Sequence, residues 1–342
     1  DVFLKLQQAV SLQPFNTLAV PARARYLVAV DSLGALQEAV DYSRQQDLER
    51  MVLGGGSNIV LASDFPGLVI QLNLRGSEIL EERADAVTVQ VAAGENWDDF
   101  VRFSLDQGWY GLENLSAIPG NVGAAPIQNI GAYGVELSSV LKAVVGYDIE
   151  AGTMRRLESE ACELAYRDSI FKHTLKDRFV ITAVELRLSK IAQPETSYPA
   201  LMAELADETP TPEAVAQAVR RVRARKLPAP DTLPNAGSFF KNPIVDQACY
   251  ERLRNAHPAM PAWPVASGVK LAAGWLLEQA GWKGYRGEGD LSGLGTYHEQ
   301  ALVLINPGRV AGQQVLALAR AITESVSERF GVELDIEPRV YG

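Results

Sequence analysis

A stretch of seventeen residues without a charged side chain, residues 118–134, constrains this chain more than any other feature. It reads Ile-Pro-Gly-Asn-Val-Gly-Ala-Ala-Pro-Ile-Gln-Asn-Ile-Gly-Ala-Tyr-Gly, with glycine at Gly120, Gly123, Gly131 and Gly134. A surface loop is normally polar, and a core helix normally avoids glycine and proline. We therefore expect backbone held close to a large, flat, partly apolar ligand, with main-chain N–H groups available to phosphate oxygens. The pattern predicts a cofactor cradle.

Length and charge narrow the class of protein. A chain of 342 residues is too long for one ordinary core, so we expect two or three domains. With 47% hydrophobic and 22% charged residues the composition is that of a globular protein. The net charge of −10 disfavours broad nucleic-acid binding. The sequence has neither an apolar run of membrane-span length nor a signal-like start, so it predicts a soluble cytoplasmic protein without a membrane partner.

The residues that commonly bind metals are few and scattered. The two cysteines, Cys162 and Cys249, can build neither a metal cluster nor a disulfide framework. The three histidines, His173, His257 and His298, have no paired spacing. We therefore expect no metal site, and a zinc hydrolase is disfavoured.

Hydrophobic periodicity predicts alternating strands and helices in the first half of the chain. Strands are expected at 26–30, 51–53, 68–72, 87–91, 143–149 and 179–188, and helices after Ser32 and over 97–105. Prolines between 194 and 212 suggest a domain boundary. Beyond it we expect helices over 212–226, 269–280 and 312–330, a strand over 301–305 and a final strand over 332–336.

A second glycine-rich segment, 54–58, directly follows the predicted strand 51–53 and reads Gly-Gly-Gly-Ser-Asn. Successive N–H groups there could form a nest for a pyrophosphate, although a simple glycine turn explains the segment alone equally well. It matches neither the Rossmann fingerprint nor the Walker pattern. Together with residues 118–134 it favours a dinucleotide clasped by two separate glycine loops.

Three further segments carry polar groups suited to chemistry. Arg167, between Tyr166 and Asp168, is either one half of a surface ion pair or a guanidinium fork for an anion, and spacing does not decide between them. Ser238 follows Gly237 as a turn serine or a proton donor, and no nucleophile elbow surrounds it.

The third such segment is the C-terminal strand, where Glu337 has two explanations. It lies on the predicted polar face of that strand, either as part of a solvated edge or as a site residue. The basic run Arg220–Lys226 suits the dipole at a helix end or an anionic substrate.

Four blocks in order give the chain a resemblance to the UDP-N-acetylenolpyruvoylglucosamine reductases of bacterial peptidoglycan synthesis. The blocks are Leu-Gly-Gly-Gly-Ser-Asn at 53–58, residues 118–134, Tyr-Arg-Asp-Ser at 166–169 and Asn-Ala-Gly-Ser-Phe-Phe-Lys-Asn-Pro at 235–243. The resemblance covers nearly the whole chain, and it points to the larger class of the family, which has an inserted tyrosine loop.

The resemblance implies an α+β fold: a two-lobed FAD-binding domain of the flavin oxidase (PCMH) type and a separate α+β substrate-binding domain. We assign 1–78 to the first FAD lobe, 79–212 to the second lobe with the tyrosine loop, 213–330 to the substrate domain and 331–342 to a strand returning to the active site. FAD would be bound non-covalently, because neither glycine loop contains a histidine for a tether.

The family's activity implies the reaction. NADPH would reduce the flavin, and the enolpyruvyl ether of UDP-N-acetylglucosamine would then take a hydride at its methylene carbon and a proton at the adjacent carbon, giving UDP-N-acetylmuramate. We expect a monomer with this small-molecule substrate as its partner.

Matched position by position, the family's catalytic residues fall on Arg167, Ser238 and Glu337. Arg167 would bind the carboxylate, Ser238 would donate the proton and Glu337 would hold the same region. The expected substrate-binding residues are Tyr198, Lys226, Asn242, Gln300 and Arg339. The expected FAD-binding residues are Gly54, Gly55, Gly56, Ser57, Asn58, Pro119, Gly120, Gly123, Gln128, Asn129, Gly131, Ala132, Tyr133 and Gly134.

Two alternatives to the reductase remain. One is a flavin oxidase of the same fold that acts on another substrate, and the missing tethering histidine weighs against it. The other is a flavin- or sugar-nucleotide-binding protein without catalysis, and the presence of Arg167, Ser238 and Glu337 weighs against that.

Overall fold

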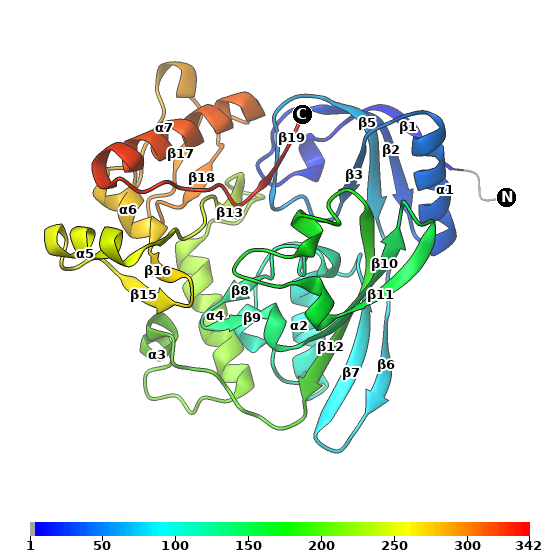
Figure 1. Cartoon of the computed structure of the whole chain (residues 1–342), viewed down its shortest axis with the longest axis horizontal. Coiled ribbons are helices and arrows are strands. Elements are labelled where there is room, and N and C mark those ends of the chain that lie inside the picture. The colour runs from blue at the N-terminus through cyan, green and yellow to red at the C-terminus, as the bar shows by residue number, and fades with distance from the viewer. Residues whose placement is uncertain (1–3) are drawn as a thin grey trace. The chain divides into compact units, whose positions relative to one another are not determined.

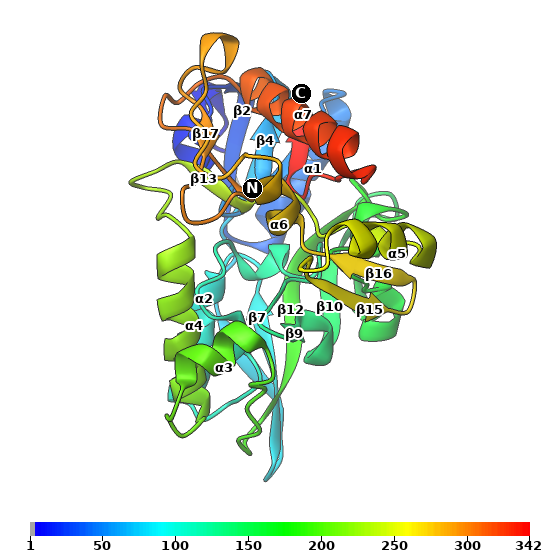
Figure 2. The ribbon, with the colours of Figure 1, turned by 90° about the vertical axis from the view of Figure 1, so that its left-hand side faces the viewer.

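The computed structural model describes residues 4–342, which divide into two compact units (Figures 1 and 2). Unit 1 comprises residues 24–55 and 66–224 together with the N-terminal segment through Val10. Unit 2 comprises residues 11–23, 56–65 and 225–342. The division thus falls inside both the segment 54–58 and the predicted helix 212–226. The functional assignment of 1–78, 79–212, 213–330 and 331–342 stays a prediction.

The first sheet of unit 1 has the strand order β1-β2-β5-β3. Helix α1 lies against it (Figure 1), and Ser32 caps that helix by accepting a hydrogen bond from the N–H of Ala35, as the sequence predicts. Leu36 of α1 and Leu68 and Ile70 of β5 share one buried cluster. The bounds are β1 Gln7–Ser11, β2 Arg23–Val30, α1 Leu33–Gln45, β3 Arg50–Leu53 and β5 Phe65–Leu72.

The second sheet of unit 1 is antiparallel with the order β11-β10-β12-β7-β6. Its inner face packs on α2, whose Trp97, Phe100 and Val101 are buried in one cluster with Val89 and Val91. Figure 2 shows the long helix α4 running beside α2, with α3 near its end. The bounds are β6 Ser77–Glu82, β7 Ala86–Ala92, α2 Trp97–Asp106, β8 Gly131–Ala132, β9 Val135–Glu136, β10 Leu141–Asp148, β11 Thr153–Glu158, β12 Phe179–Ser189, α3 Pro199–Leu205 and α4 Pro212–Lys226.

The described residues of unit 2 form small sheets and the three α-helices α5, α6 and α7. Its strand orders are β13-β18-β17, β14-β16-β15 and β19-β4, the last pair being parallel. The bounds are β4 Ile59–Leu61, β13 Asn235–Ser238, β14 Ile244–Val245, α5 Gln247–Ala256, β15 Ala262–Val265, β16 Gly268–Leu271, α6 Ala273–Gln279, β17 Gly295–Thr296, β18 Val303–Ile305, α7 Gly312–Phe330 and β19 Arg339–Tyr341. No helix among residues 4–342 combines the length and the apolar character needed to cross a bilayer.

Two predicted elements of unit 2 are wrong in part. Residues 269–271 form strand β16 rather than the start of a helix, because Val269 and Lys270 pair with strands on both sides. Only 273–279 is helical. The predicted strand over 332–336 is extended chain with a single bridge from Ile336 to Phe240, and regular pairing begins at Arg339.

Candidate active site

The two glycine-rich segments meet within unit 1. A Cβ built on Gly55 would lie 3.1 Å from the Cα of Gly120, and one built on Gly54 would lie 3.4 Å from Nδ2 of Asn121. Such a close approach of two main chains leaves little room for larger side chains at Gly55. The two glycine loops therefore lie against each other in the fold, and their binding of a dinucleotide stays a prediction.

The main chain of the segment 54–58 is available to a ligand. Among the described residues, no hydrogen bond is donated by the main-chain N–H groups of Gly55, Gly56 or Ser57. Gly56 adopts a left-handed conformation with φ of +63°. A run of N–H donors with a left-handed residue is the arrangement that binds phosphate oxygens. These residues fit the diphosphate of a dinucleotide.

Residues 118–134, called the flavin stretch after the prediction that they bind FAD, contain strained positions that other residues hold in place. Asn129 and Tyr133 have φ of +45° and +50°, which is costly for residues with a side chain. The Nδ2 of Asn129 donates to the carbonyl of Ala165 at 3.0 Å. The Nδ2 of the buried Asn114 donates to the carbonyl of Tyr133 at 2.9 Å. Hydrogen bonds to Ala165 and Asn114, which lie outside residues 118–134, therefore hold the conformation of the stretch.

The contacts of Arg167 bear on its two explanations, a surface ion pair or a guanidinium fork for an anion. Asp168 faces His173, whose Nε2 lies 2.7 Å from one carboxylate oxygen. The Nη2 of Arg167 instead donates to the carbonyl of Gly131 at 2.8 Å, and its guanidinium lies 5.1 Å from the Tyr166 ring centroid. Arg167 is therefore directed at the flavin stretch rather than paired with its neighbour.

Arg223 of α4 belongs to the same group of side chains, and the sequence did not single it out. Its Nε is buried and has no hydrogen-bond partner among residues 4–342. Burial lowers the pKa of Arg223 and the charge of Arg167 lowers it further, whereas Tyr133, which is hydrogen-bonded to it, and Asp98 act in the opposite direction. An unpaired guanidinium N–H beside a second arginine fits an anionic ligand. The only signal in the sequence was the basic run to which Arg223 belongs.

Asp98 joins three segments of unit 1. Its carboxylate accepts hydrogen bonds from Nη1 and Nη2 of Arg220 at 2.7 and 2.8 Å and from the N–H of Ala117 at 2.6 Å. Burial alone would raise the pKa of Asp98, but the bonds from Arg220 and Ala117 outweigh it and hold that pKa below its usual range. Asp98 thus ties α2 and α4 to Ala117, the residue directly before the flavin stretch.

Tyr198, the tyrosine that we assign to the inserted loop, lies against the flavin stretch. Its ring stands edge-on to that of Tyr133 with centroids 5.5 Å apart. Asn114 also donates to the carbonyl of Glu195 at 2.9 Å, so one buried amide holds both the Tyr198 loop and Tyr133. Tyr133, Tyr198, Arg167 and Arg223 form one group in unit 1.

In unit 2 the main chains that carry Ser238 and Glu337 run side by side. The N–H of Glu337 donates to the carbonyl of Phe239 at 2.9 Å, one residue after Ser238. Gly237 has φ of +67°, and the pairing of β13 with β18 is irregular between Asn235 and Ser238. The buried Phe239 anchors this turn, so the serine and the glutamate are carried on neighbouring main chains.

The C-terminal segment also lines up with the segment 54–58. Arg339 pairs with Ile59, and its N–H donates to the carbonyl of Asn58 at 3.0 Å. Its guanidinium lies 4.4 Å from the Tyr341 ring centroid. Asn58, Ser238, Glu337 and Arg339 are therefore grouped by main-chain contacts within unit 2.

The remaining predicted substrate residues of unit 2 are less closely tied to that group. Asn242 accepts a hydrogen bond from the N–H of Ala273 at 3.0 Å and so begins α6. The Oε1 of Gln300 accepts from the N–H of Leu302 at 3.3 Å. Lys226, the last residue of α4, is exposed.

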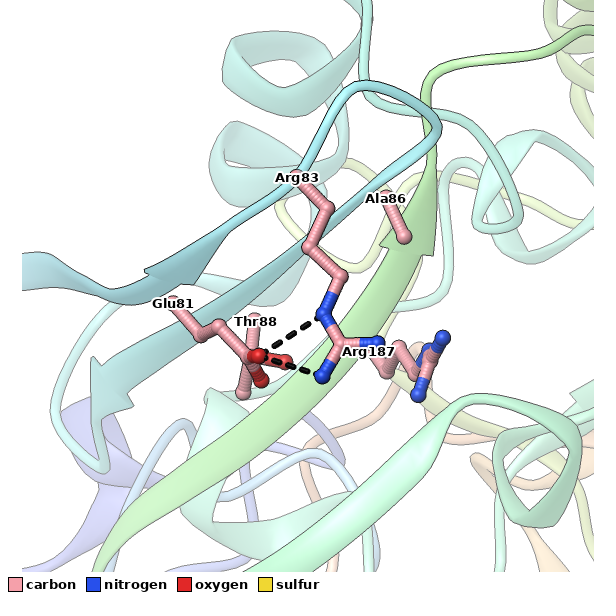
Figure 3. A pocket seen from close by; sticks show the side chains of 5 residues that line it. All are labelled: Glu81, Arg83, Ala86, Thr88 and Arg187. Atoms are coloured by element: carbon pink, nitrogen blue, oxygen red, sulfur yellow. Dashed lines mark hydrogen bonds and ion pairs between the residues drawn. The ribbon is translucent and has the colours of Figure 1, made fainter.

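A small surface hollow in unit 1 contains none of the predicted site residues. Figure 3 shows it beside the β6–β7 hairpin, where Arg83 is paired with Glu81 at 2.6 Å. Its other lining residues are Ala86, Thr88 and Arg187. No cluster of metal-binding side chains occurs within residues 4–342.

Comparison with known proteins assigns both parts of the chain. Residues 24–157 match the model of an FAD-binding domain, and residues 228–341 match the C-terminal domain of UDP-N-acetylenolpyruvoylglucosamine reductase. The reductase of that name from Pseudomonas aeruginosa is 46% identical over 342 residues, covering 99% of both chains. The reductase from Chromobacterium violaceum is also 46% identical, covering 98% of this chain and 99% of its own.

The chain belongs to the UDP-N-acetylenolpyruvoylglucosamine reductase family. It is an oxidoreductase with an FAD-binding domain, and the predicted fold class and cofactor are confirmed. A crystal structure of the reductase from Thermus caldophilus covers 99% of this chain and 100% of its own, with a TM-score of 0.67 and 24% identity, which supports the fold. Family membership favours the reductase over the flavin oxidase and the non-catalytic binding protein.

Proposed function

We propose that the chain reduces UDP-N-acetylglucosamine enolpyruvate to UDP-N-acetylmuramate, using NADPH and FAD, in peptidoglycan synthesis. Family membership supports the reaction. The observation that supports the assignment of residues is the bond from the N–H of Glu337 to the carbonyl of Phe239, which places the main chain of Glu337 next to the residue that follows the candidate proton donor Ser238.

FAD would be held by the main chain of the two glycine segments. The support is the close approach of Gly55 to Gly120 and the N–H groups of Gly56 and Ser57, which donate no hydrogen bond to any residue of the range 4–342. The fourteen residues named above as FAD-binding would take part, without a covalent tether. Bound FAD supplies the hydride, obtained from NADPH, for the methylene carbon of the enolpyruvyl group.

Arg167 and Arg223 would bind the substrate's carboxylate region in this proposal. Hydride addition leaves negative charge next to that carboxylate, so a fixed cation stabilises the developing charge. The pKa of Arg223 is lowered mainly by burial, which makes its positive charge costly until an anion arrives. Arg167 donates to Gly131 and so needs little rearrangement to point at a ligand on the flavin stretch.

Ser238 would deliver the proton to the carbon adjacent to the carboxylate. A serine is a weak acid, so it requires a developing carbanion as the acceptor and a polar neighbour to orient its hydroxyl. Glu337 would supply that neighbour. Tyr198, Lys226, Asn242, Gln300 and Arg339 would bind the nucleotide and diphosphate.

The two half-reactions test this proposal separately. In anaerobic stopped-flow, NADPH should bleach the flavin, and the enolpyruvyl sugar nucleotide should restore its colour. Ser238→Ala should retain the bleaching and slow the reoxidation by about 10²–10⁴-fold, the range for a lost general acid. Ser292→Ala, a change at an exposed loop serine, is the matched control and should change neither step.

Three results would contradict parts of the proposal. Equal slowing of both half-reactions in Ser238→Ala would remove Ser238 as the proton donor. Reoxidation by oxygen alone, with no response to the sugar nucleotide, would favour an oxidase. A folded preparation without bound flavin would remove the cofactor role.

A further inference from the structure

Arg167 occupies a backbone conformation that it cannot adopt without cost. Its φ is +48°, in the left-handed region that disfavours residues with a Cβ. Such a conformation persists only when surrounding contacts determine it, and strained residues of this kind concentrate at ligand sites. The contacts that hold this turn therefore bear on the position of the Arg167 guanidinium.

One side of the turn is held by residues that follow it in the chain. The Nζ of Lys172 donates to the main-chain carbonyl of Arg167 at 3.0 Å. The Nε2 of His173 lies 2.7 and 2.9 Å from the two carboxylate oxygens of Asp168. The turn itself closes through the N–H of Ala165 donating to the carbonyl of Asp168 at 3.0 Å.

The flavin stretch holds the other side. The Oγ of Ser169 donates to the carbonyl of Ile127 at 2.6 Å. The Arg167 side chain is fitted against Gly131, where a Cβ would lie 2.9 Å from its Nη1. The guanidinium of Arg167 is thus closely packed against Gly131. It can keep this position only if the main chain of the Arg167 turn keeps its conformation.

We propose that Lys172 and His173 are positioning residues that hold the Arg167 turn in the conformation that binds the substrate's carboxylate. Lys172 acts on the carbonyl of Arg167, and His173 acts through Asp168, the next residue along. This inference rests on the proposed role of Arg167 in the reductase reaction.

A purely stabilising role would look different. The side chains of His173 and Asp168 are 62% and 39% exposed. A side-chain contact as exposed as this one contributes little to global stability, so removing it should hardly affect unfolding. Its local effect on Arg167 should be larger, because the strained turn relaxes toward ordinary φ values when its restraints are removed. Substrate binding should therefore respond more than the melting temperature.

The test uses the FAD-loaded enzyme with Lys172→Met and His173→Ala. Half-saturation of flavin reoxidation by the enolpyruvyl sugar nucleotide should rise about 3- to 10-fold, the loss of one hydrogen bond's net effect. The rate of flavin reduction by NADPH should remain within about twofold of wild type. His173→Gln keeps a donor for Asp168 and should recover most of the binding, which a general structural role would not explain.

Lys190→Met is the matched control, because Lys190 forms a 2.7 Å ion pair with Glu82 elsewhere in unit 1. It should leave half-saturation unchanged. Unchanged half-saturation in both Lys172→Met and His173→Ala, with a normal wild type and an impaired Arg167→Lys, overturns this inference alone. An unaffected Arg167→Lys overturns the role of Arg167, and a wild type that the sugar nucleotide does not reoxidise overturns the proposed function.

Discussion

Replacing Asp98 with asparagine tests whether one carboxylate ties α2, α4 and the flavin stretch together. Asparagine keeps the shape and one acceptor, so the bond from the N–H of Ala117 survives. It loses the charge and the second acceptor needed for the two bonds from Arg220. The side chains of Asp98 and Arg220 are 21% and 14% exposed, so the ion pair lies between the surface and buried cases.

The magnitude follows from that intermediate burial. Exposed ion pairs contribute about 0.2–1 kcal/mol, and breaking a buried pair costs about 3–5 kcal/mol. We therefore expect Asp98→Asn to lower the free energy of unfolding by about 2 kcal/mol. At about 2–4 °C per kcal/mol for a domain of 150–250 residues, the melting temperature should fall by about 4–8 °C. Asp99→Asn is the control, because Asp99 is exposed in the same helical turn and loses the same helix-dipole interaction.

The reasoning is tested by the pH dependence of the stability difference between wild type and Asp98→Asn. The folded-state pKa of Asp98 is depressed, so its stabilisation is fully present above the unfolded value of about 3.9 and is lost as pH falls through the lower folded value. Chemical denaturation of wild type and Asp98→Asn should differ fully at pH 7 and less below about pH 4. A difference that stays constant down to pH 3, or one no larger than that of Asp99→Asn, would refute the reasoning.

Two further outcomes are expected. Asn114→Ala removes the hydrogen bonds to the carbonyls of Tyr133 and Glu195, so limited proteolysis should cut the loop around 190–198 several-fold faster than in wild type. Added FAD should slow this cleavage more in wild type than in the variant. Burial and the nearby acid Glu160 raise the pKa of the Cys162 thiol to about 11. At pH 8 iodoacetamide should therefore modify Cys249 but not Cys162 in the native enzyme, and both cysteines after denaturation. Detection by mass spectrometry of a Cys162 adduct in the native enzyme would contradict this prediction.

The sequence predicts the helices of this fold well where an apolar stripe and a clear end coincide. Both α4 and α7 have the predicted bounds, because their buried residues repeat at helical spacing and neither contains an internal proline. The predicted helix over 269–280 begins too early, because the alternation of Val269 and Leu271 is too short to indicate a strand before the helical pattern begins. Pairing with β14 and β15, which lie earlier in the chain, decides that those residues form a strand.

The site shows the same limit. Arg167, Ser238 and Glu337 lie in recognisable motifs, so the sequence could point to them. Arg223 is one of several basic residues at the end of a helix, and helical spacing alone does not say which of them has a buried guanidinium nitrogen. That depends on Tyr133 and Asp98, which lie about ninety or more residues earlier in the chain and meet it only in the folded unit.

The strained residues of unit 1 suggest why so many contacts surround the flavin stretch. Asn129, Tyr133 and Arg167 all have positive φ, and each such conformation costs about 1–3 kcal/mol. Each is also hydrogen-bonded to a residue outside its own turn. The side chains of Asn129 and Arg167 donate to the carbonyls of Ala165 and Gly131, and the carbonyl of Tyr133 accepts from Asn114. Because folding meets this cost, a ligand finds the stretch already shaped and loses less of its binding free energy to ordering the protein. It follows that variants which relax these turns should weaken ligand binding while leaving the fold largely stable.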